Sequence, residues 1–256
     1  GFMAADRLNR PYAMAERPVP FNGSHQRSLY ELPAIVRAHE LYHIGDEANA
    51  LREWEHAMQQ MDEEQLLVSG QLAASWGWHR NSIQAMIRAR YWDDLELRFP
   101  LAYGEHFHRA AEQHSMQPHL LYALARQESA FMHDVRSPAG ARGLMQLLPS
   151  TARQTANGNG QQISADDLYR PDVNITLGSQ YLSEMAAAYN AGPNRVKQWL
   201  RRTGDNPLPL DQWIETIPFA ETRGYVQNVL AYSVIYGARM DDPVSLFTPE
   251  ESQSRH

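Results

Sequence analysis

The stretch that decides the fold is ALARQESAF, residues 123–131. Its apolar spacing predicts a helix, because Leu121, Leu124 and Ala125 lie at i, i+3 and i+4 on one stripe. The next position on that stripe is Glu128, where the pattern asks for another core residue. A carboxyl group that loses solvation keeps its proton nearer to neutral pH and can then deliver it to a leaving group. Glu128 is therefore the first candidate for an acid in catalysis.

A structural interpretation of Glu128 stays open at this point. The side chain could lie at the margin of the stripe and pair with Arg126 or Arg142. The spacing alone favours this ordinary ion pair over a catalytic acid.

The composition describes a globular chain and excludes several classes of function. The 256 residues are 43% hydrophobic, which is enough for one large domain or two modest ones. The net charge of −7 comes without a block of like charges, so no nucleic-acid-binding arm is expected. No apolar run reaches the roughly 20 residues that a membrane-spanning helix needs. The absence of cysteine excludes disulfides, cysteine zinc sites and thiol nucleophiles.

The chain divides into a connector and two helical regions. Residues 9–28 contain three prolines that forbid a continuous helix, so we expect a loop or extended connector. Four short helices follow in residues 29–89, with breaks near Gly45, Asp62 and Gly77, and Asp46 and Asp62 are good helix N-caps. Their lengths suit stacked helical hairpins. A second, mainly helical domain is expected from residue 99. GLMQLL (143–148) is its only strand candidate, and it could equally be helix.

Three further motifs carry polar residues in apolar or glycine-rich surroundings. They are SPAGARGLMQLLPSTA (137–152), AAAYNAGPNRVKQWL (186–200) and IPFAETRGYVQNVLAY (217–232). Gly143 permits close backbone approach, and the Gln146 amide needs partners in an otherwise apolar run. Each motif alone is more often structural: a turn, a core tyrosine with one satisfied hydroxyl, or a capping acid.

We expect no metal site and no cofactor. We interpret the eleven histidines as forming no HExxH or paired metal spacing, since His106 and His108 are too close in sequence to share one helix face. No glycine-rich phosphate loop or serine-hydrolase elbow is present either.

Taken together and in this order, ARQESAF (125–131) and the three motifs closely resemble the soluble lytic transglycosylases of Gram-negative bacteria. The resemblance covers essentially the whole chain. Residues 1–27 look like the end of the family's helical ring domain and a connector, 28–98 like its linker domain, and 99–256 like its catalytic domain. The resemblance thus implies a mainly α chain, with a helical linker domain before a goose-lysozyme-like, α-rich catalytic domain that has at most a small β element.

The family's activity is cleavage of the MurNAc–GlcNAc β-1,4 bond of peptidoglycan in the periplasm, with 1,6-anhydromuramoyl products. The implied partners are glycan strands and muropeptides, with no nucleic acid and no membrane span. The resemblance makes Glu128 the single acid/base and gives Tyr189 a hydrogen bond to its carboxyl group. The implied substrate contacts are Ser129, Ser137, Gly143, Met145, Gln146, Asn190, Glu221 and Tyr225.

The sequence departs from the family in one place, where the stretch between two motifs is shorter than in relatives. The helix beginning GSQYL (178–182) runs directly into AAYN (187–190), whereas relatives have a longer helix and a loop between them. We expect a break between Met185 and Ala186, with a loop left out, because a true deletion would displace Tyr189. Two rival functions remain: a hydrolytic lysozyme on the same fold, and a peptidoglycan-binding scaffold that is inactive because the loop is gone.

Overall fold

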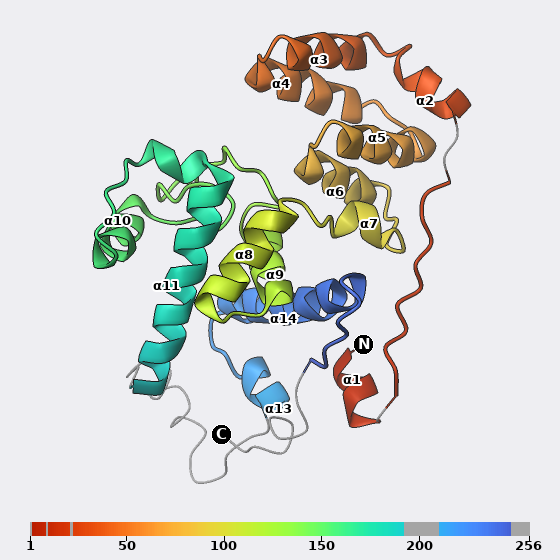
Figure 1. The fold of residues 1–256 in the computed structure, drawn as a ribbon. Coiled ribbons are helices and arrows are strands. Elements are labelled where there is room, and N and C mark those ends of the chain that lie inside the picture. Colours follow the sequence, from red (N-terminus) through yellow and green to blue (C-terminus); the bar gives the residue numbers. More distant parts are fainter. Residues whose placement is uncertain (1, 9, 21–22, 192–209, 247–256) are drawn as a thin grey trace. The chain divides into compact units, whose positions relative to one another are not determined.

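The computed structural model describes residues 2–8, 10–20, 23–191 and 210–246, without the side chains of 25–26, 186–191 and 210–211. Two compact units are present: Met14–Pro100, and Leu101–His256 together with Gly1–Ala13. Each unit is described by itself (Figure 1). The assignment of residues 1–27 to the end of another domain stays a prediction. None of the described helices is both long and apolar enough to cross a membrane.

The unit of residues 14–100 is built from helical hairpins, as the sequence predicts. Its helices are α2 (Gly23–Leu29), α3 (Pro33–His43), α4 (Glu47–Met58), α5 (Glu63–Ser75), α6 (His79–Arg88) and α7 (Leu95–Arg98). Helix α3 pairs with α4, and α5 with α6 (Figure 1). The predicted caps are confirmed: Asp46 accepts from the Asn49 amide at 3.3 Å, and Asp62 forms a capping box with Gln65.

The extended connector is tied to this unit by its backbone. The amide of Arg17 donates to the carbonyl oxygen of Asp93 at 2.8 Å, and the amide of Val19 donates to the carboxylate of Asp94 at 2.8 Å. The carbonyl oxygen of Val19 accepts from the Gln71 side chain at 2.7 Å. Val19 is buried and belongs to the hydrophobic core of the unit, so this proline-rich segment packs against the helices.

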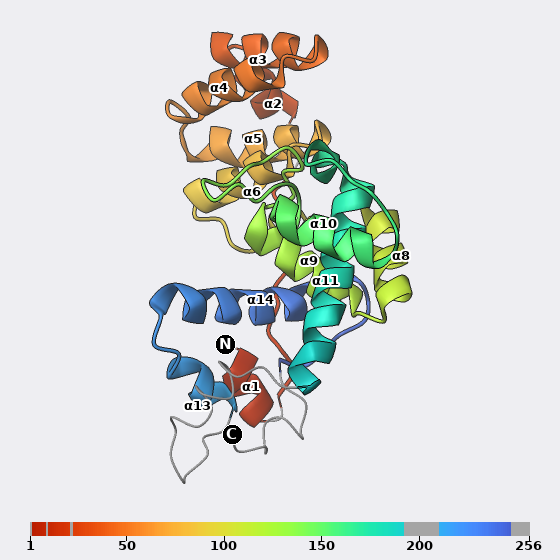
Figure 2. The same ribbon diagram turned by 90° about the vertical axis from the view of Figure 1, so that its left-hand side faces the viewer.

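The other unit is also helical. Its elements are α1 (Phe2–Arg7), α8 (Gly104–His114), α9 (Pro118–Glu128), α10 (Pro149–Gly158), η1 (Asp166–Tyr169), α11 (Pro171–Ala191), α13 (Leu210–Glu215) and α14 (Ala220–Arg239). Helix α14 packs against α9, and α11 packs against α8 (Figure 1, Figure 2). The aromatic rings of Phe107, Tyr122, Phe131 and Tyr236 are buried together between these helices.

The strand candidate GLMQLL forms neither a strand nor a helix. Residues 143–146 form a turn, and the described residues contain only isolated bridges, Arg136 to Arg142 and Arg142 to Leu147. Helix α11 runs from Pro171 to Ala191 and includes Met185 and Ala186; the expectation that a loop is left out between these two residues stays a prediction. The run MAAA (185–188) consists of strong helix formers, which favours continuation of the helix.

Candidate functional site

Glu128 is the last residue of helix α9, where the helix gives way to an irregular loop. Leu121 and Ala125 on the same stripe are fully buried, whereas Glu128 is half-buried. The hydroxyl of Tyr225 donates a hydrogen bond to Oε1 of Glu128 at 2.7 Å. The packing of α14 against α9 brings these two residues together, although they are 97 positions apart in the chain.

The Tyr225 phenol is held in its protonated, donating form. Burial, followed by the hydrogen bond to Glu128 and its negative charge, raises the pKa of Tyr225 well above its usual value. Tyr225 therefore stays a hydrogen-bond donor at any working pH. Because Oε1 accepts this bond, the proton of a neutral Glu128 carboxyl group belongs on Oε2.

Ser129 anchors the turn that follows Glu128. Its buried hydroxyl donates to the carbonyl oxygen of Leu144 at 2.8 Å and accepts from the amide of Phe131 at 3.1 Å. Ala130 and Phe131 both have positive φ, +50° and +65°, a left-handed conformation that costs energy for residues with a side chain. Burial of the Phe131 ring and the Ser129 bonds hold this conformation, which ends the helix directly after Glu128.

Gly143, in the GLMQ loop (143–146), is packed closely against Leu168 and Asn174. Its φ is +74°, and a Cβ atom there would collide with the carbonyl oxygen of Leu168 and the side-chain amide of Asn174. The resemblance implies that Gly143 contacts the substrate. The close packing at this position is already a sufficient reason for a glycine there.

Gln146 satisfies its amide within the loop. Its Nε2 donates to the carbonyl oxygens of Gly143 at 2.9 Å and Val135 at 3.3 Å, and its own φ is +46°. The sequence correctly predicted that this amide needs partners. Its role as a sugar contact stays a prediction, one that would use the Oε1 atom or a rearranged amide.

Asn174 holds the loop in place and was missed by the sequence analysis. This fully buried residue of α11 donates from Nδ2 to the carbonyl oxygens of Arg142 at 2.9 Å and Leu168 at 2.8 Å, and its Oδ1 accepts from the amide of Met145 at 2.8 Å. A buried amide with three satisfied bonds fixes its neighbours firmly. The available signal was a polar residue in the apolar run VNITL, 173–177.

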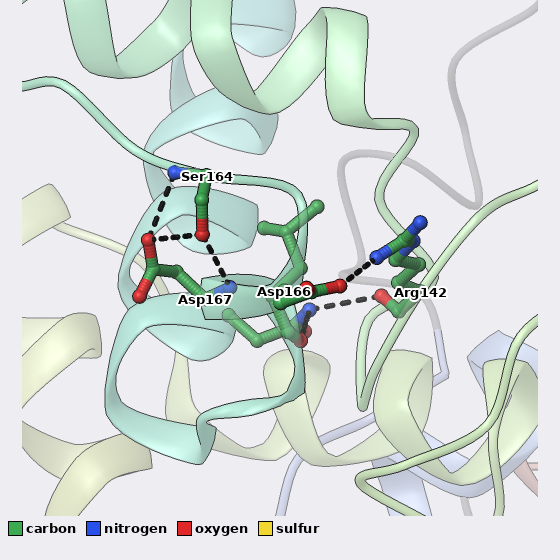
Figure 3. Close-up of polar contacts among 6 residues, drawn as sticks. Arg142, Ser164, Asp166 and Asp167 are labelled. Atoms are coloured by element: carbon green, nitrogen blue, oxygen red, sulfur yellow. Dashed lines mark hydrogen bonds and ion pairs between the residues drawn. The ribbon is translucent and has the colours of Figure 1, made fainter.

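The loop is also held from η1. Arg142 donates to Asp166 at 2.6 Å and lies over the ring of Tyr169, while the amide and hydroxyl of Ser164 both bond to Asp167 (Figure 3). Arg142 is therefore paired with Asp166 instead of Glu128, and the buried Arg126 lies over the Tyr232 ring. These contacts weaken the structural interpretation of Glu128 as one half of an ion pair.

The remaining predicted residues are placed less directly. The Ser137 hydroxyl closes a turn by accepting from the Ala141 amide at 3.1 Å, and Met145 is buried against Gly178. Glu221 is exposed, one helical turn before Tyr225 on α14. Tyr189 and Asn190 lie in the backbone of α11, but their side chains, like the expected helix joint at residues 192–193, lie outside the described residues.

A histidine pair was also missed. Residues 39–43 read HELYH, the HExxH spacing that places two imidazoles on one helix face. The interpretation that the histidines contain no HExxH or paired metal spacing is therefore wrong, and the expectation of no metal site stays a prediction.

Family models match most of the chain in three pieces. The Transglycosylase SLT domain matches residues 105–208, the Soluble lytic murein transglycosylase L domain matches 28–95, and the Soluble lytic transglycosylase helical domain matches 216–244. The soluble lytic murein transglycosylase of Salmonella typhimurium is 35% identical over 273 aligned residues, covering 99% of this chain and 41% of that protein.

Solved structures of similar proteins share the fold. Lytic transglycosylase Slt from Pseudomonas aeruginosa, solved as an inactive Glu→Gln mutant, is 41% identical with a TM-score of 0.91 over 98% of this chain and 43% of that one. The 70 kDa soluble lytic transglycosylase from Escherichia coli is 34% identical with a TM-score of 0.87, over 100% of this chain and 43% of that one. This chain belongs to the soluble lytic transglycosylase family, and it spans about two fifths of the length of these relatives.

Proposed function

We propose that this protein cleaves the MurNAc–GlcNAc β-1,4 bond of peptidoglycan in the periplasm, leaving 1,6-anhydromuramoyl ends. The observation that carries the proposal is the half-buried Glu128 carboxyl group, with Oε1 occupied by the Tyr225 hydroxyl at 2.7 Å. One oxygen is thus fixed and the other is available for proton transfer. Family membership supports the choice of peptidoglycan as substrate.

Glu128 acts first as an acid and then as a base. Its proton passes to the GlcNAc oxygen of the bond that breaks, while the 2-acetamido oxygen of MurNAc attacks C1 and forms an oxazolinium ion. The Glu128 carboxylate next takes the proton of the C6 hydroxyl, whose oxygen closes on C1 as the oxazolinium ring opens. The product is lighter by one water than a hydrolytic product, and no second carboxylate is needed, in contrast to most glycosidases.

The loop around Glu128 positions this carboxyl group. Ser129 links the end of α9 to Leu144, and Asn174 fixes the adjacent Met145. We propose the remaining residues implied by the resemblance as substrate contacts, with Tyr189 as a second hydroxyl near Glu128.

Digestion of purified sacculi in ¹⁸O-water tests the proposal. The expected result is anhydro-muropeptides with label on few new ends. Label on most new ends would identify a lysozyme, and no turnover would identify a binding scaffold.

The Glu128→Gln variant tests the assignment of the acid. Loss of general acid–base catalysis predicts a rate lower by about 10²–10⁴-fold, while the thermal midpoint is retained or slightly raised because a half-buried charge is removed. The matched control is Glu112→Gln, an exposed carboxylate on α8 of the same unit, which should keep most of the activity. Near-normal release by Glu128→Gln would overturn the assignment.

A further inference from the structure

His39 and His43 lie one helical turn apart on α3, on the same face. Their Nε2 atoms are 2.9 Å apart, and the ring centroids are separated by 4.2 Å with the rings nearly perpendicular, at 85°. In the neutral, metal-free protein this distance suits a single shared hydrogen bond between the two imidazoles. A chelated metal ion would replace that proton.

The separation selects among coordination geometries. With metal–nitrogen bonds of about 2.05 Å, two nitrogens at about 90° are about 2.9 Å apart, whereas the tetrahedral angle requires about 3.3 Å. A separation of 2.9 Å is compatible with two adjacent positions of a square-planar or octahedral ion. Cu²⁺ and Ni²⁺ prefer such geometries, and Cu²⁺ stands highest in the affinity order for nitrogen ligands.

Aromatic side chains hold one of the two imidazoles. The His39 ring is half-buried, 5.1 Å from the Trp76 ring and 5.7 Å from the Tyr30 ring. Tyr42, between the histidines in sequence, donates its hydroxyl to the carbonyl oxygen of Trp76 at 2.9 Å and so fixes α3 against that tryptophan. A ligand that is fixed in advance loses less conformational entropy on binding.

The second imidazole leaves room for water. His43 is exposed, so solvent can reach the positions of an ion that the two histidines do not fill. Among the residues that the structure describes, no group of three or more His, Asp or Glu side chains is arranged to hold a metal ion. The HELYH sequence is thus a two-ligand chelate here, without the third protein ligand of a zinc peptidase.

We propose that His39 and His43 form a chelate site for a divalent copper ion on the hairpin unit, with water completing the coordination. Cu²⁺ binds more tightly than Ni²⁺, and Ni²⁺ more tightly than Zn²⁺, whose tetrahedral preference fits the site poorly. The site lies on α3 and is independent of the proposed cleavage of peptidoglycan.

Titration of tag-free protein in a non-coordinating buffer tests the proposal, with calorimetry and tryptophan emission as parallel measurements. Bound Cu²⁺ should quench emission, because Trp76 is next to His39 and its ring is 5.4 Å from Trp54 and 5.2 Å from Trp78. Paramagnetic resonance should show two imidazole nitrogens in one tetragonal site. His39→Gln and His43→Gln should each weaken this binding by about 100-fold, because the second contact of a chelate acts at a high effective concentration.

His56→Gln is the matched control. His56 is exposed on the neighbouring helix α4 and contacts only the Gln60 side chain among the contacts described for it, so its removal should leave the tight site unchanged. Two results would overturn the proposal: unchanged Cu²⁺ affinity and quenching in the double variant His39→Gln/His43→Gln, or tighter binding of Zn²⁺ than of Cu²⁺. Each variant's circular dichroism shows whether α3 stays folded.

Discussion

The helix caps of the hairpin unit and the loop after Glu128 use polar side chains in opposite ways. In the hairpin unit, Asp46 and Asp62 bond to amides three positions along the chain and satisfy helix ends. In the loop, Ser129 reaches Leu144, 15 positions away, and Asn174 reaches Met145, 29 positions away. The first kind of contact forms helices, whereas the second holds irregular backbone where the candidate acid needs it.

This difference predicts where polar substitutions are costly. A cap at a helix end is replaceable by water when it is lost, because the end is exposed. A buried side chain that satisfies several backbone groups leaves all of them without partners when it is removed. The loop should therefore be more sensitive than the hairpins to the loss of one polar group.

Asn174→Ala should have the largest effect on stability. It leaves two carbonyl oxygens and one amide without their partner, which we expect to cost about 3 kcal/mol or more of unfolding free energy. Urea unfolding with Asn174→Asp as the companion variant sharpens the test, since Asp keeps the acceptor for Met145 and loses both donors. A loss below about 1 kcal/mol for the Ala variant would contradict the role of Asn174 in holding the loop.

Tyr225→Phe should lower kcat by about ten- to hundredfold, because a lost orienting hydrogen bond costs about 1–3 kcal/mol. Glycan binding should change less, since the bond goes to the carboxyl group and not to the sugar. Tyr189→Phe is the natural companion, because the resemblance gives Tyr189 the same role. Weakened binding with unchanged kcat in the Tyr225 variant would make that residue a substrate contact only.

Asp62→Ala should have the smallest effect, a loss of about 1 kcal/mol of unfolding free energy. The capping box with Gln65 is exposed and local, so the rate of glycan cleavage should stay unchanged. Thermal unfolding followed beside an activity assay measures both. An effect equal to that of Asn174→Ala would remove the distinction between the two regions.

The sequence predicted the regions whose contacts are local. The four hairpin helices, their breaks and both Asp caps follow from short-range spacing, and the structure confirms them. A helix over residues 123–131 was also predicted, and its end at Glu128 was not. The hydrogen bond from Tyr225 to Glu128 spans 97 positions, and no local pattern indicates it. Only the resemblance indicated that Tyr225 lies near the substrate cleft.

One residue of the candidate site shows why sequence spacing was not enough. Asn174 was missed because its three partners lie in other segments, so its burial and its bonding depend on the folded loop. The expected break at Met185–Ala186 is a different case: it came from comparison with longer relatives, although the helix propensity of the local sequence favours a continuous helix. Long-range contacts are set by the whole fold, and they lie beyond what spacing in one chain can show.

The connector's pairing with the hairpin unit has a consequence for amide hydrogen exchange. A segment with prolines at positions 18 and 20 would ordinarily exchange within moments, because extended backbone leaves its amides in water. Here the amides of Arg17 and Val19 donate to Asp93 and Asp94. These two protons should therefore persist as isolated slow signals amid fast neighbours, and they should disappear only when the hairpins themselves open.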